Sequence, residues 1–113
     1  MHEASIVQAL LDRVESEAQA HGASAVHRVH LRLGEMSGVE SDLLRAAYEV
    51  FRERGICSGA ELEIEGVAAR WSCPRCERPI LSGEPLRCPD CEIPAHLVEG
   101  EEIILARIEM EVN

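Results

Sequence analysis

The chain has 113 residues, enough for one modest domain or for a small domain with an appendage. Hydrophobic residues make up 46% of it but aromatic residues only 3%, so its core has to be aliphatic and offers no aromatic platform for stacking bases. A formal charge of −10 repels a phosphate backbone, so we expect no nucleic-acid partner and look to metal ions or basic protein surfaces instead.

The sequence also predicts where the protein works. No apolar run is long enough to cross a bilayer, and the N-terminus lacks the basic and apolar segments of a signal peptide. We therefore expect a cytoplasmic protein with no membrane partner. Thiols stay reduced in that compartment, so five cysteines, four of them in two C-P-x-C pairs, indicate metal binding instead of disulfide bonds.

Two segments have helical periodicity. In residues 5–21 the apolar side chains recur every three or four positions, which predicts an amphipathic helix with one buried face. A second helix is predicted at 39–51, after the loop GEMSG. Ser37 and Glu40 have the spacing of a capping box at the start of that helix.

Three segments, at 25–33, 61–65 and 104–112, alternate between apolar and polar residues and predict half-exposed strands. The polar face of the first carries arginines, that of the second carries glutamates, and that of the third carries both signs. This distribution suits cross-strand ion pairs, and we predict that the strands are neighbours in one sheet.

The alternation also predicts which side chains share a face. In the first strand, His27 is predicted to face inward and Val26 outward. In the last strand, Ile104 is predicted to share a face with Ile108, and Leu105 to lie on the opposite face.

A proline-rich segment at 71–94 shows neither period and is too poor in apolar residues to form a core. It contains two cysteine pairs of identical spacing: Cys73 with Cys76, and Cys88 with Cys91. Two intervening residues allow a tight turn to aim both thiolates at one ion, with its N–H groups directed at the sulfurs, so two facing turns make a tetrahedral site. We expect structural zinc there; iron in the same geometry or a redox dithiol pair are the alternatives.

Four other residues near these pairs need a separate interpretation. Glycine is common after the second cysteine of such turns, but Glu77 and Glu92 stand there. Cys57 has no partner in the pattern and is interpreted as a partly buried thiol, with a reactive or ligand role as the alternative. His96 follows the last cysteine closely enough to reach a metal in principle.

The first three residues, Met1, His2 and Glu3, form a second candidate metal site. The α-amine of Met1, with the backbone nitrogen and imidazole of His2, can close fused five- and six-membered chelate rings on one cation. Glu3 is near enough to add a nitrogen or an oxygen. Donors in a plane favour Ni(II) or Cu(II) over zinc, and such an open site suits an ion that is held briefly and passed on.

Four stretches together resemble the HypA/HybF family of hydrogenase maturation nickel-incorporation proteins over essentially the whole chain. They are MHEASIVQALLD, LRLGEMSGVESDLLRAAYE, AELEIEGVAARWSCPRC and EGEEIILARIEMEV. The resemblance implies an α+β fold of two helices packed on a small three-stranded sheet, with an inserted zinc-ribbon-like module of four cysteines. It places a nickel-binding α/β domain at 1–68 plus 99–113 and a zinc-binding domain at 69–98.

The resemblance also implies the sites and the partners. Transferable Ni(II) would bind at Met1, His2 and Glu3, and structural zinc at the four paired cysteines. The implied function is a nickel metallochaperone that works with the GTPase HypB and delivers nickel to the precursor of the [NiFe]-hydrogenase large subunit, as a monomer or at most a weak dimer. Some relatives carry histidines directly after zinc-loop cysteines, where this chain has Glu77 and Glu92.

Other classes of function fit the sequence less well. A nucleophile elbow, a phosphate-binding glycine loop and a His-Glu-x-x-His helix are all absent from the sequence, so we do not expect an enzyme. The main alternative is a zinc-ribbon module that binds another protein without delivering metal.

Overall fold

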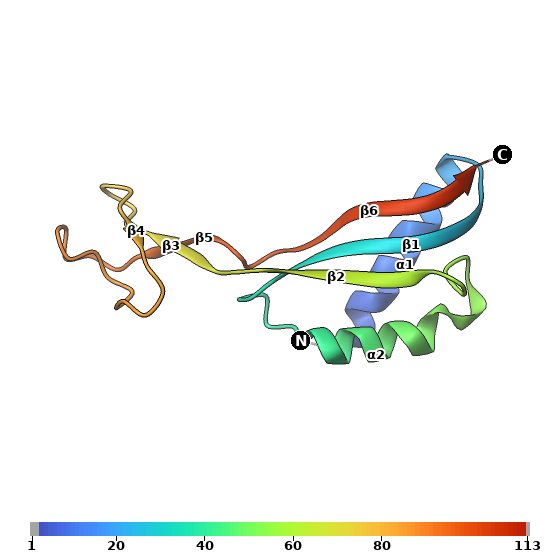
Figure 1. Cartoon of the computed structure of the whole chain (residues 1–113), viewed down its shortest axis with the longest axis horizontal. Helices are drawn as coiled ribbons and strands as arrows, with labels where there is room; N and C mark the ends of the chain where they lie inside the picture. Colours follow the sequence, from blue (N-terminus) through green and yellow to red (C-terminus); the bar gives the residue numbers. More distant parts are fainter. Residues whose placement is uncertain (1–2, 113) are drawn as a thin grey trace.

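The computed structural model describes residues 3–112 and is elongated, with principal extents of 57 × 26 × 17 Å (Figure 1). Neither helix in this part of the chain is long and apolar enough to span a membrane. In chain order the elements are α1 (Glu3–Ala20), β1 (Ala23–Gly34), α2 (Ser41–Phe51), the short 3-10 helix η1 (Arg52–Arg54), β2 (Glu61–Val67), β3 (Arg70–Ser72), β4 (Pro79–Ile80), β5 (His96–Glu99) and β6 (Ile103–Val112).

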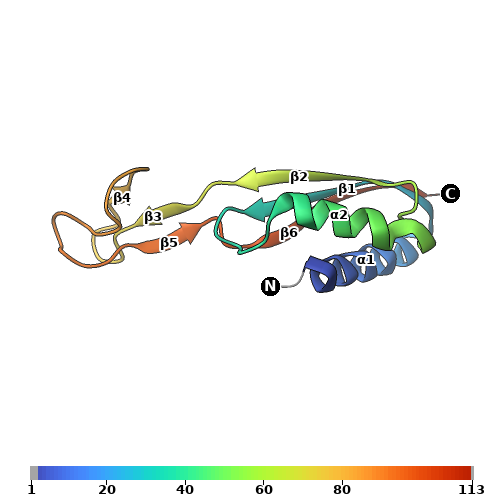
Figure 2. The same cartoon turned by 90° about the horizontal axis from the view of Figure 1, so that it is seen from below.

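The first sheet has the strand order β2-β1-β6, with β1 in the middle, parallel to β2 and antiparallel to β6. Both helices cover the same face of this sheet (Figure 2). We call this unit the helical lobe. It confirms the predicted fold class, an α+β arrangement of two helices on a small three-stranded sheet.

The helical lobe is held together by an aliphatic core between the helices and the sheet. The apolar residues of α1 recur at helical spacing, and four of them are buried: Val7, Leu10, Val14 and Ala18. From α2 the core receives Leu44 and Tyr48, and from the sheet it receives Val26, Val29, Leu31, Leu33 and Leu62. A small β-sheet becomes stable when one face is buried in this way.

The free edge of β2 is covered by arginines of α2 and η1. Arg45 donates from Nη1 to the carbonyl of Leu62 at 2.6 Å, and Arg52 donates from Nη1 to the carbonyl of Ala60 at 2.6 Å. Tyr48 donates its hydroxyl to the same Ala60 carbonyl at 2.9 Å. An edge strand is a template for unwanted pairing, and these donors occupy carbonyls that another strand would need.

The solvent-exposed face of the sheet carries the predicted cross-strand ion pairs. Arg28 on β1 lies 3.3 Å from Glu61 and 3.7 Å from Glu63 on β2, and Arg32 lies 3.7 Å from Glu65. These pairs follow the parallel register of β1 and β2. The hypothesis that the strands are neighbours is confirmed, although exposed pairs of this kind contribute only about 0.2–1 kcal/mol each.

Bulges correct two of the face predictions. The register of β1 against β6 shifts between Val26 and Arg28, so Val26 is buried whereas His27 is exposed and pairs with Glu111. The prediction had these two residues on the opposite faces. An extra residue in one strand reverses the alternation beyond it, which a strict period of two does not anticipate.

A second bulge changes β6. The pairing skips from Arg107 to Leu105, so Leu105 packs against the core together with Ile108, and Ile104 is 40% exposed. The prediction that Ile104 shares a face with Ile108 is therefore wrong.

The start of α2 also differs from the prediction. Glu40 is the N-cap residue, and its side chain makes no capping hydrogen bond. Ser37 instead accepts a hydrogen bond at Oγ from the N–H of Val39 at 3.3 Å. The predicted capping box is wrong because the helix begins at Ser41, further along the chain than the box requires.

A second small sheet, with the order β4-β3-β5, forms beyond the helical lobe. We call this unit, residues 70–99, the cysteine lobe. Its strands have two to four residues each, too few to show a period in the sequence, and the prediction missed them. Of its residues, Cys73, Cys88 and Ile80 are buried, and none belongs to the core of the helical lobe.

Two adjacent leucines of α2 offer a test of the core. Leu44 is 0% exposed and Leu43 is 52% exposed. We expect Leu44→Ala to lower the free energy of unfolding by about 2–5 kcal/mol, because it leaves a cavity between α2 and the sheet. Leu43→Ala is the control and should change it by less than about 0.5 kcal/mol. Urea unfolding followed by circular dichroism measures both, and equal losses would contradict the packing.

Candidate metal centre

The two cysteine pairs adopt the same backbone turn. In the first, the N–H of Cys73 donates to the carbonyl of Arg78 at 2.9 Å, and the N–H of Glu77 donates back to the carbonyl of Cys73 at 2.9 Å. In the second, the N–H of Cys88 donates to the carbonyl of Ile93 at 3.0 Å, and the N–H of Glu92 donates back to the carbonyl of Cys88 at 2.9 Å. Equal spacing in the sequence thus gives equal turns.

Each turn directs backbone N–H groups at the sulfur of its first cysteine. Cys73 Sγ accepts from the N–H groups of Arg75 and Cys76 at 3.4 and 3.5 Å, and Cys88 Sγ accepts from Cys91 at 3.4 Å. These donors stabilise a thiolate, and the prediction that the turns aim them at sulfur is confirmed.

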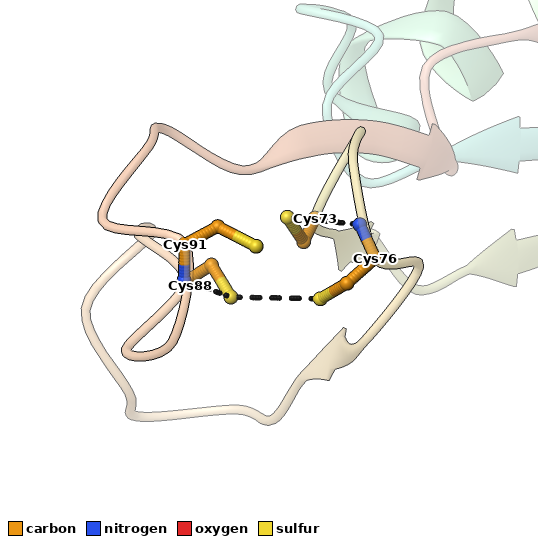
Figure 3. A group of neighbouring side chains, drawn as sticks. All are labelled: Cys73, Cys76, Cys88 and Cys91. Carbon is orange, nitrogen blue, oxygen red and sulfur yellow. Dashed lines mark hydrogen bonds between the residues drawn. The ribbon is translucent and has the colours of Figure 1, made fainter.

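The four sulfur atoms form one cluster and point toward a common centre (Figure 3). They lie within 4.8 Å of one another, and Cys76 Sγ is 3.7 Å from Cys88 Sγ. Four sulfurs about 2.3 Å from a central zinc ion would stand about 3.8 Å apart at the corners of a tetrahedron. The cluster therefore has the size of a tetrahedral four-thiolate site and fits zinc.

The electrostatics of the cluster favour a bound cation. The backbone N–H groups of Cys76 and Arg75 lower the pKa of Cys73 to about 7. The pKa of Cys91 is raised to about 12, first by burial and then by the side chains of the other cysteines. Thiolates at this distance repel one another, so all four become charged together only when a cation neutralises them.

One ion pair that the sequence analysis missed joins the two turns. Arg78 donates from Nη1 to Asp90 Oδ2 at 2.7 Å. The two residues are twelve positions apart in a segment without regular periodicity, so their opposite charges do not by themselves predict a contact. The contact could be predicted only from the assumption that the two cysteine turns face each other.

The glutamates at the glycine positions adopt a left-handed backbone. Glu77 has φ of 63° and Glu92 has φ of 57°, and they are the non-glycine residues with positive φ among residues 3–112. The left-handed region costs an L-residue about 1–2 kcal/mol. Both turns thus have the left-handed backbone conformation that glycine usually provides, although a glutamate stands at this position. Other interactions in the turns have to offset the strain.

The other predicted site residues lie elsewhere. Met1 and His2 fall outside the described residues, and Glu3 is the first residue of α1 and is partly buried. Cys57 is buried in the core of the helical lobe, beside Tyr48, and is not part of the cluster. His96 is exposed on β5, where Nε2 lies 3.4 Å from Ser72 Oγ. Within residues 3–112, the four paired cysteines are the one group of three or more possible ligands.

Fold and site together define a class: small α+β proteins in which a helical lobe carries an inserted lobe with a four-cysteine metal site. The family within that class follows from comparison with known proteins. A family profile described as "Hydrogenase/urease nickel incorporation, metallochaperone, hypA" matches residues 1–110. The chain belongs to this HypA family, and the predicted resemblance is confirmed.

Relatives match along the full length. The hydrogenase maturation factor HypA of Shewanella baltica (strain OS195) is 40% identical over 115 residues, covering 100% of this chain and 98% of that protein. The protein of the same name from Wolinella succinogenes is 41% identical over 116 residues, with coverage of 100% and 98%. Full coverage at this identity includes both lobes and the N-terminal residues.

Solved structures agree with the fold. The solution structure of the Ni metallochaperone HypA from Helicobacter pylori matches with a TM-score of 0.75 at 28% identity and covers 100% of both chains. Another structure, titled "Solution structure of HypA protein", matches with a TM-score of 0.80 at 28% identity and covers 100% of this chain and 98% of that one.

The strained glutamates give a prediction for the cysteine turns. Replacing Glu77 or Glu92 by glycine should stabilise the metal-bound turn by about 1 kcal/mol, because glycine adopts the left-handed region without a steric penalty. Competition with a chelator should show roughly fivefold tighter metal retention for each variant.

The matched controls are Glu77→Ala and Glu92→Ala, which remove the same charge but keep a Cβ atom. They should retain metal no more tightly than the unmodified protein. A gain in the alanine variants equal to that in the glycine variants would show that charge, and not backbone strain, is responsible.

Proposed function

We propose that this protein is a nickel metallochaperone that binds Ni(II) through Met1, His2 and Glu3 and delivers it for the maturation of [NiFe]-hydrogenase. Zinc held by Cys73, Cys76, Cys88 and Cys91 serves a structural purpose. The observation that carries the proposal is the family match from residue 1 to residue 110, which includes the N-terminal residues able to chelate a cation. Nickel is the cargo in this scheme and is not a resident cofactor.

The choice of zinc for the cysteine lobe rests on chemistry. Four thiolates in a tetrahedral arrangement suit an ion without redox activity or a geometric preference of its own, and zinc is that ion. The lobe has few buried apolar side chains, so metal binding has to supply the folding free energy that a core would otherwise give. Iron in the same site and a redox dithiol are the alternatives.

The choice of the N-terminus for nickel rests on donor type and access. Nitrogen and oxygen donors in a plane favour tetragonal Ni(II), whereas the thiolate cage favours zinc. Both helices begin at the end of the helical lobe that faces the cysteine lobe (Figures 1 and 2). Since α1 begins at Glu3, the described residue of the proposed nickel site lies at the start of that helix.

The remaining parts of the proposal concern partners and organisation. The GTPase HypB and the precursor of the hydrogenase large subunit are the expected partners, in the cytoplasm, and the protein acts as a carrier without catalysing a reaction. We divide it into a nickel-binding domain at 1–68 plus 99–113 and a zinc-binding domain at 69–98. Separate sheets in the two parts support this division.

Nickel titration tests the N-terminal site. Calorimetry of zinc-loaded protein should show a Ni(II) site that is lost in His2→Ala, because that variant removes the imidazole donor. Acetylation of the α-amine should also abolish it, since the terminal nitrogen donor is blocked while every side chain stays. His96→Ala, which removes an exposed histidine of the cysteine lobe, is the control and should bind nickel normally.

The same titration separates this proposal from its alternative, a zinc-ribbon module that binds protein without delivering metal. Such a module should bind Ni(II) equally well with and without the His2 imidazole. Unchanged affinity in His2→Ala and in the acetylated protein would therefore contradict nickel binding at the first three residues.

Zinc removal tests the cysteine site. Trp71, the single tryptophan, lies on β3 opposite Ile80 and Leu97, so its fluorescence reports on the cysteine lobe alone. Chelation should shift its emission to longer wavelength, and added zinc should restore it. The helical circular dichroism signal should persist, because the core of the helical lobe contains no residue of the cysteine lobe.

Elemental analysis of protein purified without chelator accompanies this experiment and should find zinc. Iron in its place would support the alternative metal. Loss of the helical signal together with the Trp71 change would contradict independent stabilisation of the two lobes.

A further inference from the structure

The two lobes meet at a fork in the first sheet. The middle strand β1 ends at Gly34, but its neighbours β2 and β6 continue into β3 and β5, which pair directly with each other (Figure 1). Strands on either side of a middle strand are roughly 10 Å apart, and paired strands roughly 5 Å. The two connections, residues 67–70 and 99–103, therefore converge just beyond the end of β1.

Gly34, the last residue of β1, and the two loop residues after it bond to both connections. The N–H of Glu35 donates to the carbonyl of Val67 at 2.8 Å, on one side. On the other side, the N–H of Gly34 donates to the backbone carbonyl of Glu102 at 2.9 Å, and the N–H of Met36 donates to the carbonyl of Gly100 at 2.7 Å. Residues 34–36 thus donate hydrogen bonds to backbone carbonyls that have no strand partner where the sheet splits.

Two glycines allow the three segments to come this close. A Cβ atom on Gly34 would overlap the carbonyl group of Gly100. A Cβ atom on Gly100 would lie 2.7 Å from Ala69 Cα, and the φ of Gly100 is +102°. The contact at the fork is therefore backbone against backbone, with no room for a side chain between the connections.

One side chain takes part in the junction. Glu35 Oε1 accepts a hydrogen bond from the N–H of Ala69 at 2.7 Å, across 34 residues of sequence. Ala69 lies in the gap between β2 and β3, where its N–H has no strand to pair with. The same residue thus binds the first connection twice, through its own N–H to Val67 and through its carboxylate to Ala69.

We propose that residues 34–36 form a clamp that fixes the orientation of the cysteine lobe relative to the helical lobe, and that Glu35 is its positioning residue. Two connections without the clamp would form a two-stranded ribbon, which is marginally stable and twists easily. The clamp ties both of them to the end of β1, which is anchored in the core through Leu33 and Leu31. This inference does not depend on nickel binding or on the identity of the metal.

The clamp also connects the cysteine lobe to α2. Residues 37–40 are the whole connection between the clamp and the first residue of α2, Ser41. A rotation of the cysteine lobe would pull on Met36 through Gly100, and the displacement would reach the start of α2. A rigid clamp prevents this, so the lobes turn as one body.

Residual dipolar couplings measured on isotope-labelled protein loaded with zinc alone test the clamp. One alignment tensor should describe the amides of both lobes in the unmodified protein. Glu35→Ala should require separate tensors and should speed hydrogen exchange of the Ala69 amide about three- to tenfold, the factor expected for one lost hydrogen bond. Glu35→Gln keeps an oxygen acceptor and should restore both measurements.

Two further variants complete the test. Glu101→Ala removes an exposed carboxylate at the same fork and should leave a single tensor. Gly100→Ala should separate the lobes, because the added Cβ displaces the connection at Ala69. Separate tensors in the unmodified protein, or a single tensor retained in Glu35→Ala, would overturn the proposal. Since nickel is absent from these measurements, their outcome is independent of the nickel titration.

Discussion

The structure depends on the central strand β1, which pairs with β6 from Ala23 to Leu33 and with β2 from Arg28 to Gly34. From Arg28 onward β1 is paired on both sides and has no free edge, and its apolar residues supply the middle of the core under both helices. Beyond Gly34 the two outer segments pair with each other as β3 and β5 in the second sheet. The end of β1 therefore marks the boundary between the helical lobe and the cysteine lobe.

The two lobes are stabilised by different physical means. The helical lobe buries aliphatic side chains against a sheet, and its edge strand β2 is covered by Arg45 and Arg52. The cysteine lobe has strands of two to four residues and little buried apolar area. Under the proposed zinc site, sulfur–metal bonds and the N–H groups directed at the thiolates supply its order instead. The left-handed Glu77 and Glu92 fit this difference, because metal coordination can hold a strained turn that a small core could not.

Much of this could be predicted from the sequence wherever the information is local. Long periodic segments predicted both helices and the three strands of the first sheet. The spacing of the cysteines predicted the metal-binding turns, because two cysteines separated by two residues can bind the same ion. The reversal of Val26 and His27 could not be predicted, because a bulge depends on how β1 pairs with a strand about 80 residues away. The fork could not be predicted either, because Glu35 acquires its hydrogen-bond partners only when residues 34–36 meet the connections at 67–70 and 99–103. Nickel binding at Met1 and His2 stays a prediction, because both residues lie outside the described part of the chain.

A lobe without a core can present a binding surface only if two separate conditions are met. Its internal shape must be fixed, which a metal ion bound by the four cysteines would do by holding the two turns against each other, with the Arg78–Asp90 pair across them. Its direction must be fixed as well, because a partner that contacts both lobes would otherwise lose binding free energy in ordering them. The loop at 34–36 meets the second condition with backbone bonds and one carboxylate. Under the proposed function, the same two conditions let a carrier hold its cargo at the first three residues while the rest of the molecule stays rigid enough to be recognised.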